Sequence, residues 1–223
     1  AATTPFVLLT VTGNSQSLVW TGAGGSAWNL NNTANWSFSG NASTFYNLDA
    51  ASFDDTAVNG TVTLTGALQP QEVIVTNTNT AYTFGGTGSL SGSAALTKNG
   101  PGTLAINTNN TYTRGTTING GTVSIGTSTG LGTGFVALNG ATLHLATTAL
   151  TFANELRLSG SSSFGLTGGN NTLTGPLAGT GALGIHFAAG GLMTLQGNID
   201  GFAGSIALTG TGGTLRFNPT SGK

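Results

Sequence analysis

Cleavage of a polysaccharide requires carboxylates, or a Lys or Arg base, gathered on one face of a protein. After residue 59 the charged side chains are instead spread along the whole chain, at Glu72, Lys98, Arg114, Glu155, Arg157, Asp200 and Arg216. No Gly-x-Ser-x-Gly sequence occurs that would hold a nucleophilic serine. The sequence therefore predicts that the protein is not an enzyme and assigns it no catalytic residue and no cofactor. A polysaccharide lyase is the remaining enzymatic alternative.

Glu155 and Arg157 are two residues apart, so on one strand they would share its outer face. The simplest interpretation of such a pair is an ion pair at the surface rather than an acid and base acting on a substrate.

The residues that could bind a metal ion are also poorly spaced for it. His144 and His186 each lie between two apolar residues, so both should point outward, about two coils and ~10 Å apart. A single metal ion needs its His ligands at ~2 Å. Asp49, Asp54 and Asp55 lack the spacing of a calcium loop. We expect no metal site, with calcium at these three carboxylates as the minor alternative.

Trp28 and Trp36 are the residues best suited to stack on a sugar ring. Large aromatic side chains mainly supply buried area, so the favoured interpretation places both rings in the core of an N-terminal cap. Stacking on a glycan is the alternative.

The elements that carry these residues are predicted by a regular series of turn residues. Asparagines recur every twenty residues, and four of the five precede Gly, at Asn59, Asn79, Asn99, Asn119 and Asn139. Asn-Gly suits tight turns because both residues tolerate positive φ. A fixed period of this length is typical of a solenoid with one coil per repeat.

Apolar residues follow the same period in two registers. The first comprises Leu64, Phe84, Leu104, Val123, Leu143, Phe164, Leu183 and Ile206, and the second comprises Ile74, Leu96, Ile118, Leu138, Leu158, Leu177, Leu195 and Leu215. Within each segment apolar residues alternate with polar ones, as in Leu104 and Ile106, which indicates strands with one buried face. The predicted fold is all-β, a parallel β-helix of roughly eight coils and about 38 Å at ~4.8 Å per coil.

Composition limits the partners. The chain has 223 residues, 38 Gly, no Cys, five Lys plus Arg, six Asp plus Glu and a net charge of −1. Nothing attracts nucleic acid or an anionic membrane, and no apolar stretch reaches the ~20 residues of a membrane-spanning helix. The absence of Cys favours a bacterial secreted protein, and the start at Ala1 is what a cleaved export signal would leave. We expect an extracellular or bacterial cell-surface location after signal-peptide cleavage.

Four segments are distinguished by composition. Residues 1–17 form an N-terminal extension with one apolar strand for self-assembly, and residues 18–58 form an aromatic capping head with all three Trp. Residues 59–218 form the solenoid body, and 219–223 a tail. No comparable cap follows Phe217, so the last coil should need a partner.

At residues 95–125 the sequence resembles a known family. Leu96-Thr97-Lys98-Asn99-Gly100-Pro101-Gly102-Thr103-Leu104 is followed by Asn110-Thr111-Tyr112 and by Gly115 to Val123. This resembles the autotransporter-associated β-strand repeat, also called the passenger-associated transport repeat. The chain departs from the pattern at Arg114, where the family has a small residue. A weaker second copy occupies residues 191–217.

The resemblance implies a right-handed parallel β-helix displayed outside a bacterial cell. It says little about a ligand.

Two functional hypotheses from different classes follow. The first is an extracellular structural β-solenoid subunit that self-assembles head to tail, with copies of itself, into a surface filament or sheath. An apolar strand of one copy would be added to the open edge of the next, so the assembly residues are predicted to be Phe6, Val7, Leu8, Leu9, Val11, Leu215 and Phe217. The alternative is a passenger-like adhesin whose head or loops bind a glycan or matrix ligand.

Overall fold

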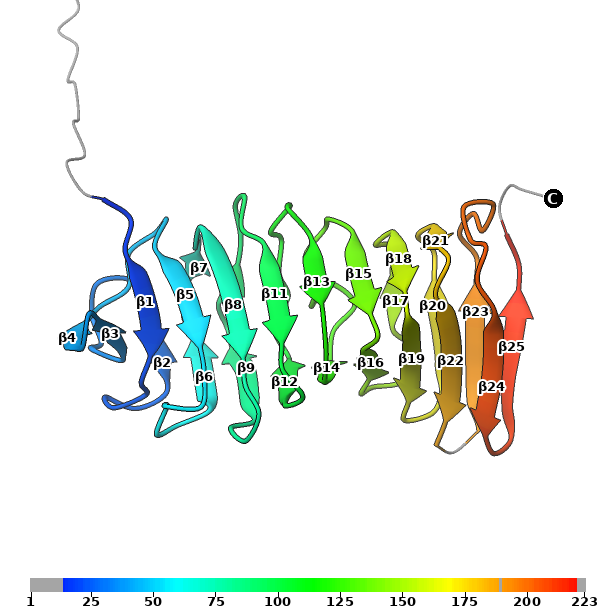
Figure 1. Ribbon diagram of the computed structural model, residues 1–223, viewed down its shortest axis with the longest axis horizontal. Coiled ribbons are helices and arrows are strands. Elements are labelled where there is room, and N and C mark those ends of the chain that lie inside the picture. Colours follow the sequence, from blue (N-terminus) through cyan, green and yellow to red (C-terminus); the bar gives the residue numbers. More distant parts are fainter. Residues whose placement is uncertain (1–13, 189, 220–223) are drawn as a thin grey trace, which may run out of the picture.

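The computed structural model describes residues 14–188 and 190–219 and shows a rod of stacked coils (Figure 1). Strands run back and forth across the rod, and about eight coils follow one another along its axis in chain order. Nearly all neighbouring strands in the sheets are parallel, with one strand contributed by each successive coil. The all-β parallel solenoid expected from the sequence is confirmed.

Two long sheets form two faces of the rod. The first sheet has ten strands, β1 (Ser17–Trp20), β3 (Trp36–Phe38), β4 (Asn41–Ser43), β5 (Ala50–Phe53), β8 (Glu72–Thr76), β11 (Leu96–Asn99), β13 (Thr116–Ile118), β15 (Val136–Asn139), β18 (Leu156–Ser159) and β21 (Leu177–Gly179). The second sheet has nine, β2 (Ala27–Trp28), β6 (Thr61–Leu64), β9 (Tyr82–Gly86), β12 (Thr103–Ile106), β14 (Thr122–Ile125), β16 (Thr142–Leu145), β19 (Ser161–Leu166), β22 (Ala182–Phe187) and β24 (Ile206–Gly210).

A third face is made of shorter stretches of sheet. Near the N-terminal end it consists of β7 (Ala67–Leu68) and β10 (Ser89–Leu90). Towards the C-terminal end it consists of β17 (Thr151–Phe152), β20 (Asn170–Leu173), β23 (Gly191–Leu195) and β25 (Gly213–Phe217).

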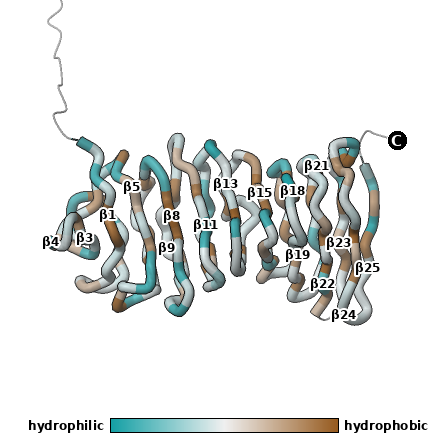
Figure 2. The backbone as a smooth tube through the Cα atoms, in the orientation of Figure 1, coloured by the Kyte–Doolittle hydropathy of each residue, from teal (hydrophilic) through white to brown (hydrophobic). Residues whose placement is uncertain are grey.

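The core is a set of apolar rows that run along the rod axis. In the second sheet Leu104, Val123, Leu143 and Phe164 are paired in register from coil to coil, and all four are completely buried. Each row forms because alternation turns every second side chain inward, and parallel pairing then places like residues above one another. Hydrophobic residues accordingly recur within the strands from β1 to β25 (Figure 2).

The structure corrects parts of the two predicted apolar registers. Ile74 pairs with Thr97 and points outward, whereas its neighbours Val73 and Val75 fill the core. Phe84 pairs with Ile106 rather than Leu104, a shift of two residues that leaves the buried face unchanged. Leu195 and Leu215 belong to the third face instead of the first sheet. A spacing near twenty identifies successive coils, but it does not show which turn takes up an extra residue.

The asparagine series forms a true row over only part of its length. Asn119 donates to Asn99 and Asn139 donates to Asn119, each over 2.8 Å, and Ser159 extends the ladder to Asn139 over 2.7 Å. Asn79 is not part of it, because the register partner of Asn99 is Thr76. Gly100 has a φ of 75°, and a side chain there would collide with the backbone of the preceding coil. Glycine is therefore required at this turn.

Residues 18–58 are part of the solenoid rather than a separate head. β1 pairs with β5 and β5 with β8 in parallel, and β2 pairs with β6 in the second sheet. The structure thus places the first coil on the N-terminal side of the predicted boundary at residue 59. What covers the end of the first sheet is a small hairpin, β3 and β4, which pairs antiparallel to β1.

A cluster of aromatic rings fills the core at this end. Phe53 lies at its centre, with ring centroids 4.9 to 5.9 Å away in Trp20, Trp28, Trp36, Tyr82 and Phe84. All of these rings are buried. The aromatic rings thus pack in the core of the first coils, and they come from strands of several successive coils.

Lys98 is a cation inside the core. Its position on β11 turns it inward, in register with Val75 and Ile118, and its side chain is completely buried. The ammonium Nζ donates to the carbonyl oxygens of Asn99 and Gly100 over 2.7 and 2.8 Å, which secures the following turn. Burial lowers the pKa of Lys98 to about 8, because the charged form loses its hydration.

We predict that Phe53→Ala lowers the free energy of unfolding by ~3–5 kcal/mol, because it leaves a cavity among five packed rings. Phe38→Ala is the matched control, since Phe38 on the capping hairpin is 40% exposed, and it should cost ~1 kcal/mol or less. Urea unfolding followed by tryptophan fluorescence measures both. Equal losses from the two variants would contradict the central role of Phe53.

We also predict that the free energy of unfolding rises with pH from about 8 to 10, with a slope of at most ~1.4 kcal/mol per pH unit. In this interval the unfolded chain still holds the Lys98 proton that the folded chain has released. Above about pH 10 the trend reverses, because burial raises the pKa of Tyr82 and Tyr112 and only the unfolded chain loses those protons. Denaturant melts across this range should show the rise in the parent chain and not in Lys98→Met.

Candidate functional site

Glu155 and Arg157 form the surface ion pair that the sequence predicts. Two parallel hydrogen bonds of 2.8 Å join the guanidinium to the carboxylate, and the guanidinium also lies 4.3 Å from the centre of the Phe135 ring. Hydrogen bonding to Arg157 lowers the pKa of Glu155. Both side chains are solvent-exposed, so solvent weakens the pair and it contributes little to stability.

The two histidines lie on one outward row of the second sheet, with Gly165 in register between them. His144 contacts Ser124 through Nδ1 at 3.1 Å and Thr167 through Nε2 at 3.2 Å. His186 contacts a threonine of the next coil in the same way. The predicted outward direction and two-coil separation are confirmed, and the hydroxyl contacts give these imidazoles a role in joining neighbouring coils.

The three aspartates near the N-terminal end are engaged separately. Asp49 accepts the backbone N–H groups of Gln16 and Tyr46 over 2.8 and 2.9 Å. Asp55 accepts three successive N–H groups from residues 78–80 of the next coil, which lower its pKa. Within residues 14–188 and 190–219, no group of three or more His, Cys, Asp or Glu could hold a metal ion.

Trp28 and Trp36 are completely buried or nearly so, with 0% and 1% of their surface exposed. Their rings pack on each other at 5.1 Å and on Phe45 and Phe53. The alternative interpretation, that they stack on a glycan, is wrong, because a buried ring presents no face to a sugar.

The residues of the recognised repeat also point inward. Asn110 is completely buried, accepts the N–H of Leu90 over 2.8 Å and donates to the carbonyl of Gly130 over 2.7 Å, so it joins three successive coils. The buried hydroxyl of Tyr112 lies 2.6 Å from that of Thr116. Asn110 and Lys98 thus satisfy backbone groups at turns between strands, and Tyr112 bonds to the side chain of Thr116. The motif therefore specifies the fold and presents no reactive group.

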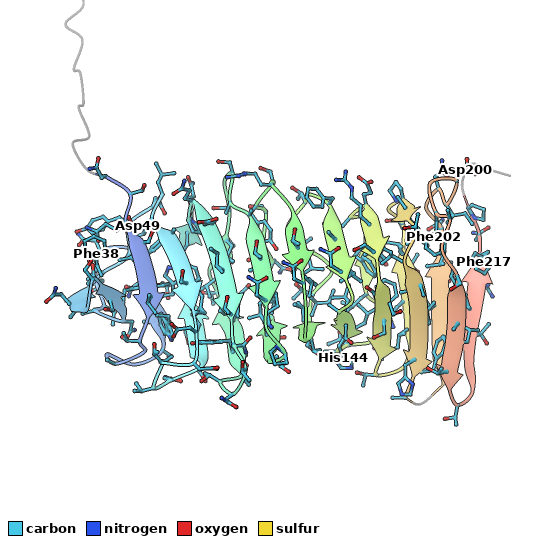
Figure 3. The ribbon with its side chains drawn as sticks, viewed as in Figure 1. Phe38, Asp49, His144, Asp200, Phe202 and Phe217 are labelled. Carbon is cyan, nitrogen blue, oxygen red and sulfur yellow. The ribbon has the colours of Figure 1, made fainter. Side chains whose placement is uncertain are left out.

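The predicted assembly residues of the last coil are placed at the C-terminal end. Leu215 and Phe217 lie on β25, which is an edge strand of the third face, and β24 is the edge of the second sheet. Phe217 is 50% exposed and Leu208 of β24 is 51% exposed. Figure 3 shows Phe217 at the extreme end of the rod, opposite to Phe38. Phe6, Val7, Leu8, Leu9 and Val11 lie outside the described residues.

Besides Phe217, which the sequence analysis names, the structure adds exposed apolar side chains that the sequence reasoning missed. In the part of the chain that is described, the large apolar side chains with the greatest exposure are Leu30, Phe38, Tyr46, Leu48, Val58, Leu208 and Phe217. They belong to the first coils and the last coil, and the shaft between contributes none. For Tyr46, Leu48 and Val58 the available signal was their place in loops, outside the strand alternation.

The described residues include no helix with the length and apolarity needed to cross a membrane.

Comparisons with known proteins agree with this fold. The family model described as Passenger-associated-transport-repeat matches residues 96–125, which cover β11 to β14. The adhesin BmaC autotransporter of Brucella suis biovar 1 (strain 1330) is 34% identical over 233 aligned residues, which represent 88% of this chain and 6% of that protein. The chain thus spans a small part of the length of this relative. No solved structure matches the chain. The repeat and the stacked coils that it builds show that the chain belongs to the autotransporter-associated repeat family of bacterial surface and secreted proteins.

Proposed function

We propose that this chain is a non-catalytic structural subunit that assembles end to end, through copies of itself, into an extracellular filament or sheath. The observation that carries the proposal is the confinement of exposed large apolar side chains to the first coils and the last coil of the rod. Burial of apolar surface drives most protein association. Contacts at the ends would therefore be favoured over contacts along the shaft.

The C-terminal end offers two strand edges as well as apolar side chains. β24 and β25 each have five residues, and each lies last in its sheet. An open edge with N–H and C=O groups binds a further strand, and alternate side chains such as Leu208 and Phe217 would then be covered. The apolar residues Phe6 to Val11 of another copy are suited to supply that strand.

The two ends of the rod differ in structure, which favours a head-to-tail contact between copies. An antiparallel hairpin closes the first sheet at the N-terminal end, whereas the last described strands at the other end, β24 and β25, belong to parallel sheets. A contact between unlike surfaces is heterologous, and it continues indefinitely unless its rotation closes a ring. Repetition along the rod axis would give a filament.

The shaft fits a passive role. Its outward row of asparagines is occupied by hydrogen bonds between coils, and its charged residues are scattered or paired. No paired acid and base is presented to a polymer in the part of the chain that the structure describes. We propose on this basis that the chain is not an enzyme.

An adhesin segment is the second candidate function. It is favoured by the similarity to the Brucella suis protein, which is named an adhesin. In that case the end contacts would be made with neighbouring coils or with a ligand, and the purified chain would remain a short rod.

We predict that the purified chain forms filaments in negative-stain electron microscopy. Removal of residues 1–12 should give dispersed short rods, because the added strand is lost. Leu208→Asp and Phe217→Asp should do the same, because each places a charge in the apolar contact. Thr97→Asp, an outward substitution on the shaft, is the matched control and should still form filaments.

Circular dichroism of each variant checks that the solenoid remains folded. Dispersed rods from the parent chain would overturn the assembly proposal and leave the adhesin candidate. Filaments that persist in both end variants would show that the contact lies elsewhere and would equally overturn it.

A further inference from the structure

An open pocket of about 850 Å³ lies at the edge of the first coils, beside the start of the rod. Three segments form it: residues 14–16 ahead of β1, the loop 46–49 ahead of β5, and Gln71 ahead of β8. Figure 3 shows Asp49 of this loop near the N-terminal end of the rod, the end at which Phe38 also lies. The volume falls within the ~300–1,000 Å³ of pockets that bind small ligands.

Hydrogen bonds to neighbouring segments hold the loop 46–49 in place. Asp49 fixes the backbone of Gln16 and Tyr46, and its own carbonyl accepts the N–H of Gln71 over 3.0 Å. Asn47 Oδ1 accepts the N–H of Gln69 over 2.9 Å, and the N–H of Leu48 donates to the Gln69 carbonyl over 2.7 Å. These bonds connect the loop to the next coil, so its side chains are displayed on a preorganised backbone.

The conformation of Leu48 is costly and is not explained by packing. Its φ is 75°, in the left-handed region that favours glycine, and its side chain is 61% exposed. Strain of this kind at an exposed apolar residue is typical of binding loops. Tyr46 lies two residues away, is 52% exposed, and donates its hydroxyl to Asn31 Oδ1, which fixes the ring.

The lining is rich in amides. Primary amide groups come from Asn14, Gln16, Asn47 and Gln71, and each amide can both donate and accept. The carboxylate of Asp49 is 4% exposed, and both of its oxygens already accept backbone N–H groups. A ligand therefore meets amide groups, a tyrosine and a leucine, with no cation among the lining residues.

We propose that this pocket binds a neutral saccharide. A sugar ring has an apolar C–H face, which would pack on Tyr46 and Leu48, and a rim of hydroxyls, which would bond to the amides of Gln16 and Gln71. An acidic saccharide would find no cation among the lining residues. The proposal deepens the adhesin candidate and does not rest on end-to-end assembly, and it gives glycan binding a location in place of the buried Trp28 and Trp36.

The test is binding of the full chain to a panel of neutral hexose and N-acetylhexosamine oligosaccharides, with sialylated and sulfated oligosaccharides beside them. We expect at least one neutral oligosaccharide to bind and the acidic ones to bind no better. Tyr46→Ala should weaken binding at least tenfold, and Gln71→Ala should weaken it less. Phe38→Ala, an exposed aromatic outside the pocket, is the control and should leave binding unchanged.

Leu48→Gly separates binding from folding. Glycine relieves the positive φ, so the midpoint of thermal unfolding should stay the same or rise while the affinity falls. A fall in both would mean that Leu48 is merely structural and would count against the proposal.

The proposal is overturned if no neutral saccharide binds, or if Tyr46→Ala binds as well as the parent. Binding that appears only after removal of residues 1–12 would also overturn it, because the chain itself would then be the natural occupant. Filaments are scored separately by electron microscopy, so the failure of one proposal is distinguishable from the failure of the other.

Discussion

The interaction on which this structure depends is the parallel pairing of each coil with the next. A single coil cannot bury its own inward side chains, and Leu104 or Val123 is covered only because the neighbouring coils present like residues in register. The same pairing satisfies the backbone along all three faces. In the last described coil, Leu208 and Phe217 are half-exposed.

The polar residues of the repeat belong to this same interaction. Asn110 joins three coils, Asp55 binds successive N–H groups of the next coil, and Lys98 holds the carbonyls of its own turn. Buried polar groups persist only where their hydrogen bonds are satisfied, so these positions accept few other residues. A repeat defined by such positions identifies an architecture. It does not identify a ligand, because none of these groups is free to meet one.

The segments that are suited to interact with other molecules are therefore those that interrupt the regular stack of coils. The hairpin β3–β4 and the loop 46–49 belong to the first coils, and β24 and β25 belong to the last described coil. The end edges suit association with another solenoid, whereas the strained and exposed Leu48 suits contact with a small ligand.

The sequence by itself determined the fold class and the buried face of most strands. Alternation with a period of two decides which face turns inward, and a repeat near twenty residues decides that strands stack as coils. The tertiary structure alone decided the register and the pocket beside Asp49, and it decided in favour of the buried interpretation of Trp28 and Trp36 over the exposed one. Ile74 shows the reason. Turns take up extra residues without changing the period, so the spacing alone cannot show which residues pair in register between coils. Loop conformations arise from contacts between coils, and no local pattern encodes them.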